Sequence, residues 1–144
     1  MPIKYPLRIG TIVWCNYDLG GFTPPEMIKK RLAVVVSPRL PQRDKLATVV
    51  PLSTTPPHRD ISYQCKIEIE KDLPKPYTSK VVWAKCDMMA TVSYSRLDLI
   101  RDGRNETTGK RKYLQLFIGD ENLNKIRTSL LCSLGLEALT KEEY

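Results

Sequence analysis

Apolar and polar positions along this chain follow the periods of short β-strands. Residues 32–37 (LAVVVS) and 46–52 (LATVVPL) are nearly continuous apolar runs, which is typical of strands covered on both faces. Residues 65–70 (CKIEIE) alternate, which predicts a strand with one exposed face. Further β-prone segments are expected at residues 9–15, 81–86, 91–94 and 113–118.

Near the end of the chain the apolar period changes to that of a helix. A spacing of three and four residues predicts an amphipathic helix whose apolar positions are Leu123, Ile126, Leu130 and Leu134. Asp120 is expected to cap this helix and Gly135 to end it. Short strands followed by one helix predict a mainly β fold, a small barrel with a C-terminal α-helix packed on it, as a single domain over residues 1–144.

Charge adds a class of ligand to this picture. The 144 residues include 23 Lys+Arg and 16 Asp+Glu, a formal net charge of +7. Such an excess favours nucleic acid, an acidic protein or an anionic membrane face, although it is also typical of a surface kept soluble by its charge. No apolar run approaches the ~20 residues of a membrane span, and the N-terminus resembles no signal peptide. We therefore expect a cytoplasmic protein with no membrane partner.

The sequence offers little material for a metal site. Its four cysteines are widely spaced without a C-x-x-C pair, and its single histidine, His58, lies in a proline-flanked loop. Scattered cysteines in apolar stretches favour buried free thiols. We expect neither a metal ion nor another cofactor.

The strongest candidate chemistry lies at the ends of the two apolar strands. Arg31 precedes the first run, and Ser53 and Thr54 follow the second. A fixed cation beside hydroxyl donors is suited to gripping a phosphate. Such a set fits RNA cleavage, because RNA carries its own nucleophile, the 2′-OH. Alternatively, Arg31 belongs to a solvated charge run with Lys29 and Lys30, and the hydroxyls cap a loop.

Three further features each allow two interpretations. Lys85 and Asp87 would share one face of a strand, either as an acid and a base or as a surface ion pair worth ~0–1 kcal/mol. Trp83, like Trp14, is either a core residue or, if exposed, a platform for stacking on a base. The polar, mostly basic residues 101–112 form an exposed loop or hairpin tip, which either contacts an RNA backbone or is simply solvated.

Taken in order, several motifs resemble those of the MazF/PemK family of ribonuclease toxins. A strand of the form G-x-[IV]-V-W-x-x-[FY] is matched by GTIVWCNY at residues 10–17. An Arg followed by an apolar strand ending in Ser-Pro is matched at residues 31–38, and the strand end V-P-[ILC]-[ST]-[ST] at residues 50–54. The segments PPEM (24–27) and KCD (85–87) resemble the PemK-like branch.

This resemblance implies a fold, a reaction and partners. The fold would be a small SH3-like barrel of the CcdB/PemK type with a C-terminal helix, working as a homodimer. The reaction would be metal-independent, sequence-specific cleavage of single-stranded RNA, leaving 2′,3′-cyclic phosphate and 5′-OH ends. The partner would be a cognate antitoxin protein whose acidic tail covers the RNA groove.

The resemblance also implies residue roles. Arg31 would be the catalytic arginine, Ser53 or Thr54 would fill the threonine position, and Glu26 would help to shape the site. Asp87 would be the base of the family's R-C-D triplet, in which this chain has Lys85 in place of Arg. Since lysine lacks the planar fork of arginine, bidentate phosphate contact is lost at that position, while a proton donor remains.

Two other functions remain open for the same fold. One is a non-catalytic toxin that poisons DNA gyrase through the C-terminal helix, as a sister family does. The other is an SH3-like module that binds RNA without cutting it. Gyrase-dependent DNA breaks, or tight RNA binding without product, would select one of these over the ribonuclease.

Overall fold

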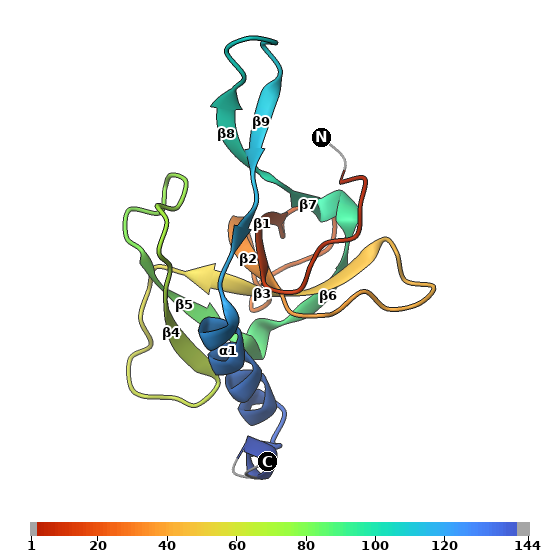
Figure 1. Cartoon of the computed structure of the whole chain (residues 1–144). Coiled ribbons are helices and arrows are strands. Elements are labelled where there is room, and N and C mark those ends of the chain that lie inside the picture. The colour runs from red at the N-terminus through yellow and green to blue at the C-terminus, as the bar shows by residue number, and fades with distance from the viewer. Residues whose placement is uncertain (1–2, 141–144) are drawn as a thin grey trace.

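The two apolar runs of the sequence become neighbouring central strands. In the computed structural model of the chain, which describes residues 3–140, β2 (Lys30–Val35) pairs antiparallel with β3 (Leu46–Ser53). β1 (Thr11–Asn16) pairs with the other edge of β2 (Figure 1). The main sheet has the order β10-β1-β2-β3-β5-β4, with β6 on β3 and β7 on β1.

The remaining elements complete this sheet, add a hairpin and end in a helix. The other strands are β4 (Gln64–Glu68), β5 (Val81–Lys85), β6 (Ala90–Ser93), β7 (Leu97–Asp98), β8 (Ile100–Arg104), β9 (Arg111–Leu114) and β10 (Leu116–Phe117). The helices are α1 (Asp120–Ser133) and the short 3₁₀ helices η1 (Cys86–Met88), η2 (Tyr94–Arg96) and η3 (Glu137–Thr140). The predicted mainly β fold with one C-terminal α-helix is confirmed.

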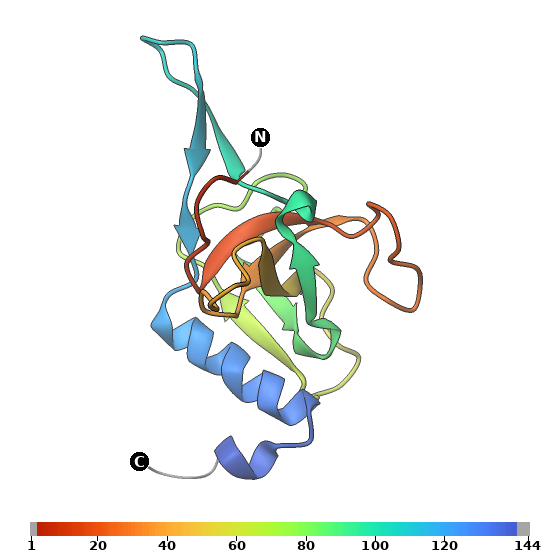
Figure 2. The same ribbon diagram turned by 90° about the vertical axis from the view of Figure 1, so that its right-hand side faces the viewer.

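Both faces of β2 are buried, as its unbroken apolar run predicts. Leu32 and Val34 face one apolar cluster, which α1 covers with Leu123 and Ile126. Residues 33 and 35 face a second cluster, formed with β1, β6 and β7. Figure 2 shows α1 lying across one side of the bent sheet. Since alternate residues of a strand point to opposite faces, two cores require apolar side chains throughout β2.

The helix ends where predicted, but it starts differently. Gly119, with φ of 83°, is the N-cap, and Asp120 is the first helical residue. The prediction that Asp120 caps the helix was therefore wrong, although its carboxylate still lies at the positive end of the helix dipole. At the other end Gly135 has φ of 76°. Its N–H donates to the Cys132 carbonyl and that of Leu136 to the Leu131 carbonyl, at 3.1 and 2.8 Å, a Schellman motif that favours glycine.

Three strand predictions need correction. β5 ends at Lys85, one residue early, because the chain turns into η1. The segment 113–118 is divided between β9 and β10, and the short β7 was not predicted. The basic segment 101–112 is the exposed end of the β8–β9 hairpin.

The cysteines are free thiols, of which Cys15 and Cys86 are buried and Cys65 and Cys132 half-buried. Across residues 3–140, no three side chains of histidine, cysteine, aspartate or glutamate come together in a group that could hold a metal ion. Within the same range, each helix is too short or too polar to cross a membrane.

Candidate nucleic-acid interface

Arg31 is half-buried at the start of β2, with its guanidinium held by the backbone. Its Nε donates a hydrogen bond to the Ile28 carbonyl at 3.0 Å. Within the described part of the chain no carboxylate forms an ion pair with it. The two terminal nitrogens are therefore oriented but not neutralised. An oriented, uncompensated guanidinium can bind phosphate oxygens bidentately.

Next to Arg31, a tyrosine hydroxyl separates β2 from β3. The register that pairs Ala33 with Pro51 would place Leu32 opposite Leu52 and Arg31 opposite Ser53. The Tyr77 hydroxyl lies between Leu32 and Leu52. It accepts a hydrogen bond from the Leu32 N–H at 3.0 Å and donates one to the Leu52 carbonyl at 2.9 Å. One hydroxyl thus replaces a direct ladder bond and holds the strand ends apart where Arg31 and Ser53 face each other.

Tyr77 is well placed for this role. It is 8% exposed, and its ring packs against Trp14 with centroids 6.1 Å apart. Burial raises the pKa of Tyr77, while the hydrogen bond from the Leu32 backbone and the positive charge of Arg31 act in the opposite direction. The hydroxyl therefore keeps its proton and acts as both donor and acceptor.

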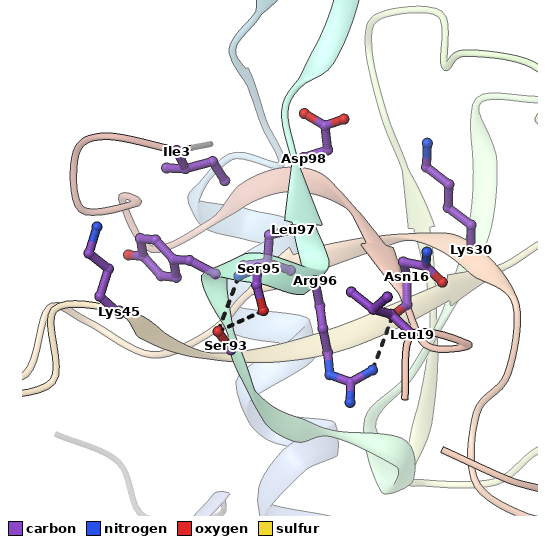
Figure 3. A pocket seen from close by; sticks show the side chains of 11 residues that line it. Ile3, Asn16, Leu19, Lys30, Lys45, Ser93, Ser95, Arg96, Leu97 and Asp98 are labelled. Atoms are coloured by element: carbon purple, nitrogen blue, oxygen red, sulfur yellow. Dashed lines mark hydrogen bonds between the residues drawn. The ribbon is translucent and has the colours of Figure 1, made fainter. Parts of the chain in front are cut away.

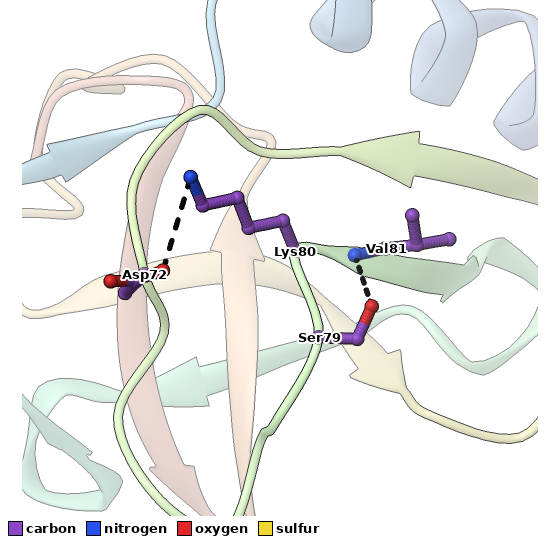
Figure 4. A network of polar contacts seen from close by, with 4 residues as sticks. All are labelled: Asp72, Ser79, Lys80 and Val81. Carbon is purple, nitrogen blue, oxygen red and sulfur yellow. Dashed lines mark hydrogen bonds and ion pairs between the residues drawn. The ribbon is translucent and has the colours of Figure 1, made fainter.

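The loop that carries Tyr77 is tied at its base. The Ile69 N–H donates to the Lys80 carbonyl at 2.9 Å. The Lys80 ammonium lies 3.9 Å from the Asp72 carboxylate, and the Val81 N–H donates to the Ser79 hydroxyl at 3.0 Å (Figure 4). The ion pair is exposed and contributes little, so the backbone bonds and the buried ring fix the position of Tyr77.

A row of polar and aromatic side chains continues from Arg31 across the sheet. Ser53 pairs with Trp83 on β5, and Trp83 pairs with Lys66 on β4. Residues directly opposite each other in neighbouring strands project from the same face. Arg31, Ser53, Trp83 and Lys66 therefore form one row, which we call the Arg31 row. A half-buried indole between a hydroxyl and a lysine is suited to stacking on a base beside a phosphate.

The two hydroxyls of the doublet differ in environment. Ser53 is only 4% exposed, and its Oγ accepts a hydrogen bond from the Thr55 N–H at 3.1 Å. This bond caps the following loop, as the simpler interpretation of the sequence expects. The Ser53 hydroxyl proton remains free to donate to a phosphate oxygen bound by Arg31. Thr54 is exposed just beyond β3, so it offers the more accessible hydroxyl.

Lys85 and Asp87 do not share the geometry expected of them. Lys85 is the last residue of β5, on the same face as Trp83. Asp87 lies one residue into η1, where the alternation of a strand no longer applies. The prediction that the two side chains share a strand face was therefore wrong, and within residues 3–140 they form no ion pair. Lys85 shares the face of the Arg31 row, two residues along β5 from Trp83, whereas Asp87 is exposed just beyond the end of the strand.

The long loop 17–29 reaches Arg31 through its backbone. Glu26 is exposed and its Oε1 accepts a hydrogen bond from the Thr23 N–H at 3.3 Å, so its carboxylate organises the loop itself. Lys29 is also exposed, with φ of 70°, and its N–H donates to the Asp18 carboxylate at 2.6 Å. These contacts place the Ile28 carbonyl that holds Arg31. Glu26 and Lys29 thus shape the loop, and within residues 3–140 neither forms a hydrogen bond with the Arg31 side chain.

Arg96 anchors the same loop from the other side of β1. Its terminal nitrogens donate to the carbonyls of Asn16 and Gly20 at 3.3 and 2.8 Å. Its guanidinium also lies 4.7 Å from the ring centroid of Phe22. Figure 3 shows Arg96 reaching toward Asn16 and Leu19. Arg96 therefore stabilises the loop, and its guanidinium is already occupied by these contacts.

Lys30 projects from the face of β2 opposite to that of Arg31. Its ammonium lies 5.1 Å from the ring centroid of Trp14, a cation–π contact. It also lines a hollow of about 610 Å³ beside β7, together with Lys45 and Arg96 (Figure 3). Arg31 and Ser53 are absent from the residues lining this hollow. This hollow is therefore separate from the Arg31 row, whose arrangement across four strands suits an extended strand more than an enclosed small molecule.

Two contributors to the site were missed in the sequence. Tyr77 follows a proline in a loop whose sequence is typical of a plain connection, and only its hydrogen bonds to β2 and β3 reveal its role. Lys66 was predicted to face outward, but its place beside Trp83 depends on the pairing of β4 with β5. The alternation of residues 65–70 gave the exposed face of Lys66 and could not give its neighbour.

Comparison with known proteins gives relatives along most of the chain. Residues 8–129 match the family described as "PemK-like, MazF-like toxin of type II toxin-antitoxin system". The chain is 30% identical to the putative uncharacterized protein YifN of Escherichia coli (strain K12), over 96% of this chain and 99% of that protein. It is 32% identical to an uncharacterized protein of Haemophilus influenzae, over 70% and 76% of the two chains.

Solved structures share the fold at lower identity. An endoribonuclease in complex with its cognate antitoxin from a mycobacterial species is 23% identical, with a TM-score of 0.57 over 91% of this chain and 96% of that one. MazF from Deinococcus radiodurans is 16% identical, with a TM-score of 0.58 over 92% and 99%. The fold is therefore MazF-like, and the chain belongs to the PemK/MazF-like toxin family of type II toxin–antitoxin systems.

Proposed function

We propose that this protein is an endoribonuclease toxin that cleaves single-stranded RNA at short sequences. The observation that carries the proposal is the Arg31 guanidinium, which is oriented by the Ile28 carbonyl, has no counter-ion in the described chain and faces Ser53 across an opened ladder. The solved endoribonucleases of the same fold support the class of reaction.

The proposed reaction is an internal transesterification. The ribose 2′-oxygen attacks the adjacent phosphorus, and the bond from phosphorus to the 5′-oxygen breaks. A base takes the 2′-OH proton, an acid protonates the leaving 5′-oxygen, and the products carry a 2′,3′-cyclic phosphate and a 5′-OH. Arg31 stabilises the negative charge of the phosphorane, where a preorganised donor is most effective, and no metal ion is needed for these steps.

The remaining roles follow the resemblance and the geometry together. The hydroxyls of Ser53 and Thr54 donate to phosphate oxygens, Asp87 is the proposed base, and Lys85 is the proposed acid. Trp83 stacks on a base of the substrate. Glu26 and Lys29 contribute through the loop that borders Arg31, and Lys30 contributes positive charge on the opposite face of β2.

The proposed setting is that of a cytoplasmic toxin. The protein works as a homodimer and is inhibited by a cognate antitoxin whose acidic segment covers the Arg31 row. The structure of the mycobacterial endoribonuclease with its antitoxin supports such a partner, and the formal net charge of +7 suits both an acidic protein and RNA.

The experiment is RNA cleavage by purified protein in excess chelator, with 5′-OH ends mapped by ligation and sequencing. Arg31→Ala should lower kcat/KM by about 10² to 10³-fold. Arg31→Lys should give an intermediate loss, since it keeps the charge and loses the fork. Arg39→Ala, at an exposed loop position, is the control with the same loss of charge. Full activity of a folded Arg31→Ala variant would overturn the assignment, and RNA binding without any cleavage would select the binding module.

A further inference from the structure

Only the base of the β8–β9 hairpin, Ile100 and Leu114, reaches a core, and residues 101–112 add no apolar side chain to it. The hairpin forms a separate two-stranded sheet, and Figures 1 and 2 show it projecting from the body of the molecule. All side chains of residues 101–112 are exposed, and the segment RDGRNETTGKRK contains no apolar residue. Burial is therefore not the reason for its conformation.

The hairpin is nevertheless ordered by its own bonds. Asn105 organises the tip, because its Oδ1 accepts from the N–H groups of Thr107 and Thr108 at 2.9 and 3.0 Å. Its backbone N–H donates to the Lys110 carbonyl at 2.7 Å. Arg104 closes the same turn by donating to the Gly109 carbonyl at 3.0 Å. The strands thus present their side chains in a defined arrangement.

That arrangement gathers arginine on one face. Arg101 pairs with Tyr113 and Arg104 with Arg111, with a register shift between the two pairs. Paired residues share a face, and so do Arg111 and Tyr113, two positions apart. The extra residue at the bulge, where Gly103 has φ of 74°, keeps all four on the same side. We call Arg101, Arg104, Arg111 and Tyr113 the arginine face.

The two sides of the hairpin differ in charge balance. Asp102 and Lys112 project from the side opposite the arginine face and offset each other. The arginine face has no acidic member, and the described chain pairs none of its arginines with a carboxylate. Like charges placed directly opposite each other, as in the pair of Arg104 and Arg111, destabilise a hairpin. A polyanion bound to this face would remove that repulsion.

The geometry points to the arginine face as a second RNA contact, one that grips the backbone of the strand cleaved at Arg31. This inference rests on the proposed function for the identity of the polyanion. Three guanidinium groups suit phosphates, and a tyrosine among them suits stacking on an unpaired base. That combination favours single-stranded RNA over an acidic peptide, which has no bases to stack.

The hairpin lies within reach of the same RNA molecule. Cys15 of β1 pairs with Arg31 on one edge and with Leu97 of β7 on the other, and β8 follows β7 directly. Adjacent strands are spaced by about 4.8 Å, so Leu97 lies roughly 10 Å across the sheet from the strand position of Arg31. The root of the hairpin, Ile100, follows Leu97 by three residues. A substrate of several nucleotides spans that distance, whereas a di- or trinucleotide at Arg31 does not extend along the hairpin.

The test compares two neighbouring cations on opposite faces of the hairpin. Arg111→Gln and Lys112→Gln remove the same charge one residue apart. Affinity is measured over a series of salt concentrations for a long single-stranded RNA and a trinucleotide, each with 2′-O-methyl sugars so that the nucleophile is blocked. Cleavage of the matching ribose substrates by the wild type is measured in parallel, and circular dichroism verifies the fold of each variant.

We expect Arg111→Gln to weaken binding of the long RNA regardless of its sequence, and to reduce the magnitude of the salt slope by about 0.7. Lys112→Gln should change neither quantity, and trinucleotide binding should be equal in both variants. Equal losses of RNA affinity in the two variants would show that only the net charge of the hairpin matters, and would overturn the inference. The inference would also be overturned if Arg111→Gln left RNA binding unchanged but abolished binding of poly-glutamate, a probe for an acidic peptide. Binding that depends on Arg111 in a wild type that cleaves nothing would refute the proposed function alone.

Discussion

Replacing Tyr77 with phenylalanine removes the one oxygen atom that bridges β2 and β3 beside Arg31. The ring, which packs against Trp14, is retained. What is lost is the hydroxyl that accepts from the Leu32 N–H and donates to the Leu52 carbonyl. Both bonds are buried, so water does not replace the missing partner.

The cost can be worked from these two bonds. Each buried hydrogen bond contributes about 1 kcal/mol net, and each buried group left unpaired costs ~1–3 kcal/mol. If β2 and β3 stay apart, the loss approaches the upper end, about 3 kcal/mol. If they close, Leu32 bonds directly to Leu52 and the loss falls to about 1 kcal/mol. Closure would also move Arg31 toward Ser53.

The assay is urea unfolding followed by circular dichroism, with hydrogen exchange of the Leu32 amide as a local probe. Tyr63→Phe is the control, because Tyr63 is 39% exposed and water can serve its hydroxyl. In the cleavage assay, Tyr77→Phe should lower kcat by about 10 to 100-fold with KM little changed, because a displacement of about 1 Å at the reacting groups costs that much. A loss of stability under about 0.5 kcal/mol, with unchanged exchange at Leu32, would refute the role given to this hydroxyl.

Two further predictions concern the helix and the cysteines beneath it. Gly135→Ala should lower the free energy of unfolding by about 1 kcal/mol through its positive φ, since nothing lies within 4 Å of an added Cβ; the same urea titration checks this, and an unchanged midpoint would contradict it. The pKa of Cys65 is lowered from 9.0 to about 7, mainly by a hydrogen bond from the Cys86 thiol. The Cys86 Sγ also lies 3.7 Å from the Ile126 carbonyl. Alkylation of Cys65 should therefore fall off as the pH drops through about 7, and stability should rise with pH between about 7 and 9, because the unfolded thiol keeps its proton over that interval. Cys86→Ala should move the alkylation midpoint toward the ordinary thiol value, and an unmoved midpoint would refute the cause.

The sequence by itself determined the elements whose side chains repeat with a period. The apolar runs gave β2 and β3, the alternation at residues 65–70 gave β4, and the helical spacing gave α1 with its end at Gly135. These succeed because burial acts on each residue locally, through the face that it presents. The ordered motifs from Gly10 to Thr54 also gave the family, to which the chain belongs.

Only the tertiary structure decided how these elements meet. The row from Arg31 to Lys66 depends on the registers of four strands, and the arginine face depends on a bulge at Gly103. Lys85 and Asp87 were misjudged because a strand gives way to a 3₁₀ helix between them. Tyr77 lies more than 20 residues from either strand that it bridges, at separations of 45 and 25 positions. Such contacts have no period along the chain, because they are fixed by packing between segments that the sequence keeps apart.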